Sequence, residues 1–159
     1  MEEFTMANQT LTQANQELQK QLNLQIANWT VLYTKLHNFH WFVKGPNFFT
    51  LHEKFEALYN EAAGYIDDIA ERLLAIGGTP IATLREALAT ASISEASGKE
   101  SADEMVAAIV ADFAKLDSEL KEGMEAAERA EDEATSDLLL GIVSSLEKHR
   151  WMLNAYLGK

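Results

Sequence analysis

Residues 50–80 read TLHEKFEALYNEAAGYIDDIAERLLAIGGTP, and this stretch decides the fold class. Thr50, followed three residues later by Glu53, has the spacing of a helix-capping box, in which each side chain satisfies a main-chain amide. The run 77–80, Gly-Gly-Thr-Pro, ends the helical pattern. Between these signals, apolar residues recur at steps of three and four: Phe55, Leu58, Tyr59, Ala62, Ile66, Ile69, Leu73 and Ile76. The stretch therefore predicts one long helix with a single apolar side.

Three further long helices are predicted around this one. The first runs from near Thr10 to the break at Gly45-Pro46, the third is capped by Ser101, and the fourth follows the acidic turn 131–133. Their apolar sides carry Leu11, Leu18, Leu22, Ile26, Trp29, Leu32 or Tyr33, and Leu36 in the first helix; Val106, Ile109, Phe113, Leu116 and Leu120 in the third; Leu139, Ile142, Val143, Leu146, Leu153 and Tyr156 in the fourth.

A polar segment separates the second helix from the third. Residues 81–100 hold a short helical piece from Thr83 to Leu88 and then become rich in Ser and Gly. A connection of this length lets the second and third helices run parallel. We therefore predict an all-α fold, a four-helix bundle with a short helix in the long crossover between helices two and three. Residues 1–159 are expected to form one domain, with residues 1–9 as a flexible N-terminal tail.

Composition excludes several classes of function. The 159 residues contain 13 Lys plus Arg against 25 Asp plus Glu, a net charge of −12, which repels nucleic acid and anionic membranes and attracts cations. With no cysteine, the chain cannot form disulfides, thiolate nucleophiles or iron–sulfur clusters. Residues 1–6 lack the basic start and apolar run of a signal peptide, and the apolar runs are far shorter than the ~20 residues that span a bilayer. We expect a cytoplasmic protein without a membrane partner.

Candidate metal ligands are concentrated on the second helix. The four histidines are His37, His40, His52 and His149, and three of them lie around the Gly45-Pro46 break. His52 and Glu56 are four residues apart, as are Asp67 and Glu71, so each pair projects from one side of the helix. An imidazole combined with carboxylates suits Fe²⁺, Mn²⁺ or Zn²⁺. Taken alone, the Asp67/Glu71 pair is also typical of a solvated helix face.

The spacing of these two pairs predicts a site shared between chains. From His52 to Asp67 is roughly 22 Å along a helix, too far for one metal site, although both pairs lie on the same side. If two copies of this helix pack antiparallel about a twofold axis, the His52/Glu56 pair of one chain meets the Asp67/Glu71 pair of the other. We therefore predict two equivalent sites per dimer. No histidine follows a Glu by three residues, so the intrachain Glu-x-x-His iron site is not available.

Four motifs resemble the signature of the Dps family, the mini-ferritins or DNA-binding proteins from starved cells. They are residues 36–41 (LHNFHW), 44–48 (KGPNF), 51–55 (LHEKF) and 66–72 (IDDIAER), and the similarity extends from about Leu18 to Gly158. The resemblance implies a ferritin-like bundle and a hollow homododecamer of 23 symmetry with a ferroxidase site at each twofold interface. The ligands implied are His40, His52, Glu56, Asp67 and Glu71. Many members have Asp at the position of Glu56, a departure that bears on the second metal.

The function implied by the resemblance is iron storage and detoxification. The protein would oxidise Fe²⁺, preferentially with hydrogen peroxide, and store ferric oxyhydroxide in the cage, which protects DNA indirectly. The resemblance further implies two irons at each site, one of them bound tightly, with Zn²⁺ or Mn²⁺ as substitutes. The alternative is a non-catalytic helical shell, a surface or immune-stimulating protein whose metal site is degenerate.

Other residues have a functional and a structural interpretation. Trp41 is expected to pack over the metals, or to be an interface aromatic; His37 is expected to orient a ligand or water, or to be a hydrogen-bonded interface histidine. His149 is expected to be structural. For the iron-entry pore that the family forms at its threefold axes, we predict Asp132, Glu133 and Asp137, whereas a helix cap and a solvated face are the alternatives.

Direct DNA binding is not expected. Family members that bind DNA usually have a flexible terminus rich in Lys and Arg, but residues 1–19 contain neither, and Lys20 is the first basic residue. The opposite end offers only Lys159. The net charge of −12 also repels the phosphates of DNA, so the chain is not expected to contact them.

Overall fold

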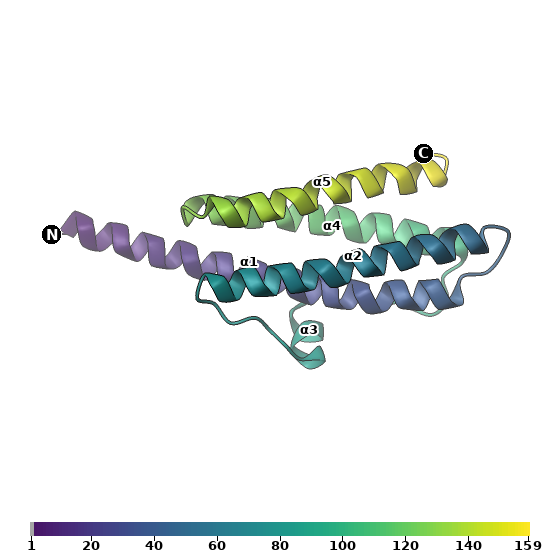
Figure 1. The fold of residues 1–159 in the computed structure, drawn as a ribbon, viewed down its shortest axis with the longest axis horizontal. Coiled ribbons are helices and arrows are strands. Elements are labelled where there is room, and N and C mark those ends of the chain that lie inside the picture. The colour runs from purple at the N-terminus through teal and green to yellow at the C-terminus, as the bar shows by residue number, and fades with distance from the viewer. Residues whose placement is uncertain (1) are drawn as a thin grey trace.

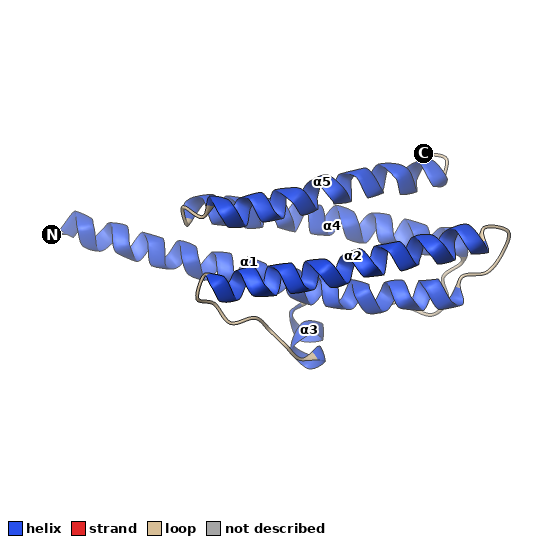
Figure 2. Ribbon diagram, viewed as in Figure 1, coloured by secondary structure: helices blue, strands red, loops and turns tan. Residues whose placement is uncertain are grey.

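The chain folds into five helices, and this computed structural model describes residues 2–159. They are α1 (Glu2–Phe42), α2 (Phe48–Ala75), α3 (Leu84–Thr90), α4 (Ala102–Arg129) and α5 (Glu133–Tyr156). The described residues contain no strand (Figure 2). Helices α1 and α2 form one antiparallel hairpin, α4 and α5 form another, and the crossover that carries α3 runs along the outside (Figure 1). The predicted four-helix bundle, with α2 and α4 parallel and a short helix in the crossover, is confirmed.

The core lies where the apolar sides of the four long helices meet. Its largest fully buried side chains are Trp29 and Phe39 of α1, Phe55 of α2 and Phe113 of α4. The apolar residues predicted on α2 are buried, except that Tyr59, Ile66 and Ile76 are only partly covered. The sequence left open whether Leu32 or Tyr33 of α1 belongs to the core. Leu32 is fully buried and Tyr33 is exposed, so Leu32 is the core residue. Burial of this apolar surface drives the helices together.

Two helix starts differ from the sequence prediction. α1 begins at Glu2 and not near Thr10, and residues 2–9, predicted as a flexible tail, are helical; Met1 lies outside the described residues. The Thr10 hydroxyl donates a hydrogen bond to the Met6 carbonyl, 2.9 Å away, so it lies within the helix and caps nothing. α2 begins at Phe48, two residues before Thr50, after a turn in which Gly45 has a φ of +111°. The chain reverses direction in this turn, and the turn needs glycine at that φ. The turn, and not the capping pattern at Thr50, therefore decides where α2 begins.

The remaining helix starts follow their capping signals. Ser101 accepts a hydrogen bond from the Glu104 amide while Glu104 bonds back to the Ser101 amide, so the predicted capping box at α4 is confirmed. Thr83 and Glu86 form the same arrangement at α3, which runs slightly later than the predicted piece 83–88. Gly77, with a φ of +86°, follows the end of α2 as the sequence predicts.

Buried polar groups fasten the crossover to the bundle. Asn28 of α1 donates to the Glu119 carboxylate of α4 at 2.7 Å and accepts from the Ser92 amide at 2.8 Å. Lys35 donates to the Ser94 carbonyl and pairs with Asp112, each at 2.8 Å. Burial raises the pKa of Asp112 above its ordinary value, although Lys35 opposes that shift. The segment after α3 is therefore held against α1 and α4 by specific bonds.

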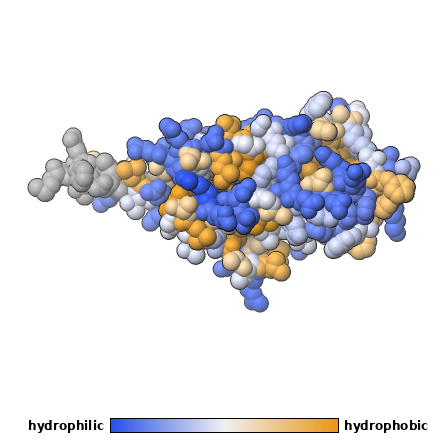
Figure 3. Space-filling view, in the orientation of Figure 1, coloured by the Kyte–Doolittle hydropathy of each residue, from blue (hydrophilic) through white to orange (hydrophobic). Residues whose placement is uncertain are grey.

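The outer surface is mixed in polarity. Figure 3 shows polar side chains across most of one face, with apolar patches between them. Among residues 2–159, no helix combines the length and the apolar character that a membrane crossing requires.

Candidate metal centre

His40 and His52 meet at the end of the α1–α2 hairpin. The two imidazole rings are stacked, with centroids 3.7 Å apart and planes 14° from parallel. His40 Nδ1 lies 2.6 Å from the His52 carbonyl oxygen, and His52 Nδ1 lies 2.7 Å from the His40 carbonyl oxygen. A carbonyl oxygen only accepts, so each Nδ1 must donate its proton. With Nδ1 as the donor, the neutral form of each ring has its lone pair on Nε2, which is the arrangement that metal-binding histidines show.

The surroundings of this pair restrict its movement. His40 is buried, with 7% of its surface exposed. The Phe48 ring stacks against His52 at 5.0 Å between centroids and 25° between planes. Because main-chain bonds and ring contacts both hold the two imidazoles, their Nε2 atoms are placed before any metal arrives.

Glu56 lies one turn after His52 on α2 and is exposed. Its Oε1 accepts a hydrogen bond from the Tyr59 hydroxyl at 3.3 Å. Desolvation and the Glu56 carboxylate raise the pKa of Tyr59, so the phenol keeps its proton and acts as the donor. The Tyr59 ring also stands edge-on to His40, with centroids 5.4 Å apart. Tyr59 thus links two of the predicted ligands.

Asp67 and Glu71 lie further along α2, and both are exposed. Among the side chains that the structure describes, no three His, Asp or Glu come together closely enough to hold a metal ion. A single chain thus brings His40 and His52 together, with Glu56 one turn away, but does not add the second acidic pair to them. The site formed between two chains stays a prediction.

His37 and Trp41 flank the same cluster. His37 donates from Nδ1 to the Tyr33 carbonyl at 2.7 Å, and its ring stacks on Tyr59 with centroids 3.7 Å apart and planes 17° from parallel. Trp41 lies 5.3 Å from the His37 ring, between centroids, and is 65% exposed. In this chain His37 reaches the predicted ligands through Tyr59. Sequence reasoning missed Tyr59 as a site residue because its apolar spacing assigned it to the core.

Comparison with known proteins places the chain in a family. The ferritin-like domain model matches residues 19–159. The chain is 63% identical over 136 residues to a DNA protection during starvation protein of Brevibacillus brevis, covering 86% of this chain and 91% of that protein. A crystal structure of a Dps protein from Bacillus brevis superposes with a TM-score of 0.90 at 60% identity, over 91% of this chain and 97% of that one. The chain belongs to the Dps family.

Two further relatives agree with this assignment. This Dps protein is 58% identical over 144 residues to general stress protein 20U of Bacillus subtilis, covering 91% of this chain and 99% of that protein. The structure of Listeria innocua Dps soaked with zinc superposes with a TM-score of 0.86 at 43% identity, over 89% of this chain and 97% of that one. Because these relatives are matched over nearly their whole length, the resemblance drawn from the four motifs is confirmed, and the family model extends it over residues 19–159.

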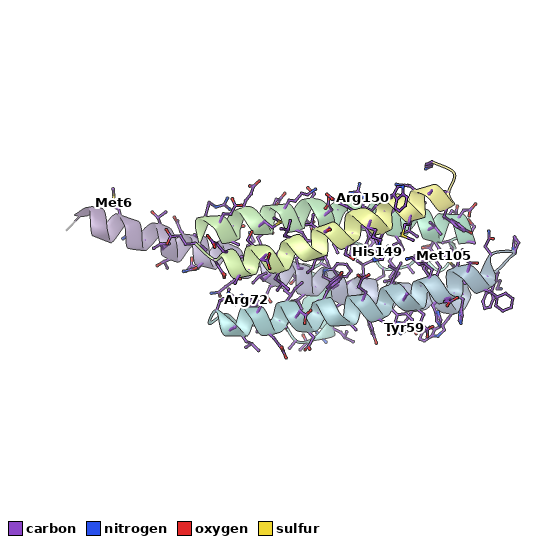
Figure 4. The ribbon with its side chains drawn as sticks, turned by 45° about the horizontal axis from the view of Figure 1, so that its top comes forward. Met6, Tyr59, Arg72, Met105, His149 and Arg150 are labelled. Carbon is purple, nitrogen blue, oxygen red and sulfur yellow. The ribbon has the colours of Figure 1, made fainter. Side chains whose placement is uncertain are left out.

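The fourth histidine of this Dps protein is used inside the bundle. His149, which Figure 4 labels on α5, contacts the Glu61 carboxylate of α2 through Nε2 at 2.5 Å. Glu61 also accepts from the hydroxyls of Ser145 and Tyr65, each at 2.7 Å. Burial alone would raise the pKa of Glu61, but the hydrogen bonds from His149, Ser145 and Tyr65 outweigh it and lower the pKa to about 2. These contacts fit the structural role expected for His149.

The predicted pore residues surround a hollow near the α4–α5 turn. Seven residues line its volume of about 620 Å³: Glu128, Glu131, Asp132, Glu133, Ser136, Asp137 and Leu140.

Asp132 does not present its side chain there as an unbound acid. It caps α5 by accepting from the Thr135 amide at 3.0 Å, and it pairs with Arg72 of α2 at 2.9 Å. Burial opposes ionisation, but the bonds from Thr135 and Arg72 lower the pKa of Asp132. The capping alternative therefore describes Asp132, whereas Glu133 and Asp137 are exposed acids in the hollow.

Proposed function

We propose that this Dps protein oxidises Fe²⁺ with hydrogen peroxide at sites shared between two subunits. The resulting ferric oxyhydroxide is stored inside a homododecameric cage of 23 symmetry, and DNA is protected indirectly because free Fe²⁺ and peroxide are both consumed. The observation that carries this proposal is the His40/His52 pair, whose carbonyl-bound Nδ1 atoms leave both Nε2 lone pairs for a metal.

The ligand set combines residues from two chains. One subunit supplies His40, His52 and Glu56. The partner subunit's Asp67 and the partner subunit's Glu71 complete the set. Two neutral imidazoles and three carboxylates suit Fe²⁺, and the negative charge favours keeping the Fe³⁺ product. One iron binds tightly and the second more weakly, with Zn²⁺ or Mn²⁺ as substitutes.

The chemistry balances with two irons. Each Fe²⁺ loses one electron, the O–O bond of peroxide accepts both electrons, and two protons complete two water molecules. A single iron would supply one electron and release a hydroxyl radical. The protein contributes the placement of the two irons, since it holds the imidazoles rigidly and sets the carboxylates around them.

Mixed oligomers test whether the site is shared. Chains carrying His52→Ala/Glu56→Ala and chains carrying Asp67→Ala/Glu71→Ala are each expected to be inactive as pure oligomers. In a random equal mixture half of the twofold dimers are mixed, and each mixed dimer has one intact site of its two. Peroxide-dependent Fe²⁺ oxidation should therefore return to about a quarter of the wild-type level.

The control and the contrary result are simple to define. Asp68→Ala, at the exposed residue next to Asp67, should keep wild-type oxidation. A mixture as inactive as its two parents, or a parent that oxidises Fe²⁺ at the wild-type rate, would refute the shared site.

A further inference from the structure

We propose that Tyr59 is a positioning residue, which restrains the Glu56 carboxylate one helical turn after His52 so that Glu56 can serve as a metal ligand. The inference rests on the proposed metal site and adds to it a residue that binds no metal itself. Three features of the cluster carry it: the restraint of the ring, the hydrogen bond to the carboxylate, and the length of the Glu side chain.

The Tyr59 ring is held mainly by α1. It stacks on His37 at 3.7 Å and meets Tyr33 edge-on at 6.1 Å, both between centroids. His37 is itself fixed, because its Nδ1 donates to the Tyr33 carbonyl. Figure 4 shows Tyr59 on α2, toward the helix end that follows the α1–α2 turn. A ring restrained on these sides presents its hydroxyl from a defined place.

The hydrogen bond leaves Glu56 able to bind metal. The Tyr59 hydroxyl occupies Oε1 of the carboxylate, at 3.3 Å, so Oε2 and the second lone pair of Oε1 remain available. A flexible, exposed glutamate would otherwise sample several rotamers, and each must be given up when a metal binds. The hydroxyl restricts that sampling in advance. Carboxylate ligands that are themselves hydrogen-bonded are a general feature of metal sites.

The length of Glu56 makes this support specific. An Asp at position 56 would draw the carboxylate back by about 1.5 Å, the length of one carbon–carbon bond. The hydrogen bond is already 3.3 Å long, so the shorter side chain would lose it without movement of the helix. Tyr59 therefore supports Glu56 but not an aspartate in its place, and this difference separates a positioning hydroxyl from a ring that only packs.

A double-mutant cycle tests the inference on the assembled protein. The four proteins are wild type, Tyr59→Phe, Glu56→Asp and the double variant, and Tyr33→Phe is the matched control. Tyr33 belongs to the same ring cluster, but its hydroxyl makes no hydrogen bond to a predicted ligand in the described part of the chain. Co²⁺ alone is titrated without oxidant, and its visible absorption reports both affinity and coordination. Initial rates of Fe²⁺ oxidation then separate KM from kcat.

We expect Tyr59→Phe to weaken Co²⁺ binding and raise the KM for Fe²⁺ by roughly three- to tenfold, with an altered Co²⁺ spectrum. The same substitution in the Glu56→Asp background should change binding less than twofold, and Tyr33→Phe should match wild type. Equal losses in both backgrounds, or a Tyr59→Phe variant that binds Co²⁺ like wild type, would overturn the inference. If wild type bound Co²⁺ without oxidising Fe²⁺, the proposed function would fail while the binding cycle still decided the role of Tyr59.

Discussion

The imidazoles of His40 and His52 are tied to each other's main chain, since each Nδ1 donates to the carbonyl oxygen of the other residue. This reciprocal pair joins the last turn of α1 to the first turns of α2, on either side of the Gly45-Pro46 turn. It fixes the tautomer of both rings at the same time as it fixes the hairpin. The geometry of these two predicted ligands is therefore a consequence of how the hairpin closes.

Replacing His52 with Ala should remove one predicted ligand and the ring that stacks on His40, although the hydrogen bond from His40 Nδ1 to the main-chain carbonyl of residue 52 remains possible. Peroxide-dependent Fe²⁺ oxidation is expected to fall at least tenfold, because loss even of groups that only orient metal ligands costs about 10–100-fold. Asp68→Ala is the matched control, since Asp68 is an exposed residue of the same helix. Initial rates at saturating peroxide measure both. Equal losses in the two variants would argue against the assignment of His52.

Acid should remove a stabilising contribution from Glu61. Its pKa is about 2 in the folded chain against an ordinary value of 4.5, so the charged form is favoured by folding. The contribution is fully present above pH 4.5 and is lost as the pH falls toward 2. After solvent screening it amounts to about 1–2 kcal/mol.

Thermal unfolding of wild type and Glu61→Gln from pH 7 to pH 2 measures this contribution. The melting temperature of the variant should be lower by roughly 2–8 °C at pH 7, and the difference should shrink below pH 4.5. A difference that stays constant down to pH 2 would show that the Glu61 carboxylate is not the source.

Neutralising the exposed acids of the hollow should slow iron entry. Glu133→Gln/Asp137→Asn is expected to reduce the rate of Fe²⁺ uptake, while oxidation at sites loaded beforehand stays unchanged. Adding Asp132→Asn should also lower stability by about 1 kcal/mol, because Asp132 caps α5 and pairs with Arg72. Stopped-flow uptake at low salt, with urea unfolding alongside, separates the two effects. Unchanged uptake in the double variant would remove the pore assignment.

DNA should not bind directly at moderate salt. The first 19 residues carry no Lys or Arg, and the chain has a net charge of −12. In a gel-shift assay without Mg²⁺, the assembled protein is expected to leave the DNA band unmoved. A variant with several Lys residues introduced among residues 2–9 provides the positive control, and a shift by the wild-type protein would contradict the prediction.

Much of the fold could be predicted because helix period and helix breaks are local signals. The apolar steps placed Phe55, Leu58 and Leu73 in the core, and Ser101 marked the start of α4. The starts of α1 and α2 could not be predicted from capping spacing. A threonine followed by Glu or Gln occurs inside helices as well as at their ends, and the turn at Gly45 decides where α2 begins.

The candidate site divides in the same way. The spacing of His52, Glu56 and the later acidic pair was readable because a helix converts sequence distance into position. The stacking of His40 on His52 and the role of Tyr59 depend on how α1 packs on α2. The spacing of residues along one helix does not predict that packing. Asp132 was ambiguous for a similar reason, since its partner Arg72 lies 60 residues away.

The polar contacts of Glu61 also decide how α2 and α5 align along their lengths. Two helices that touched only through apolar side chains could slide past each other by one turn, about 5.4 Å, and remain packed. After such a slip, Glu61 would keep the hydrogen bond from Tyr65 of its own helix but lose His149 and Ser145 of α5, and a half-buried carboxylate that loses two of its three donors is disfavoured. One sliding position is thus preferred over its neighbours. Because α2 also carries His52 and Asp67, these contacts also set where along the bundle the two predicted ligand pairs reach its surface.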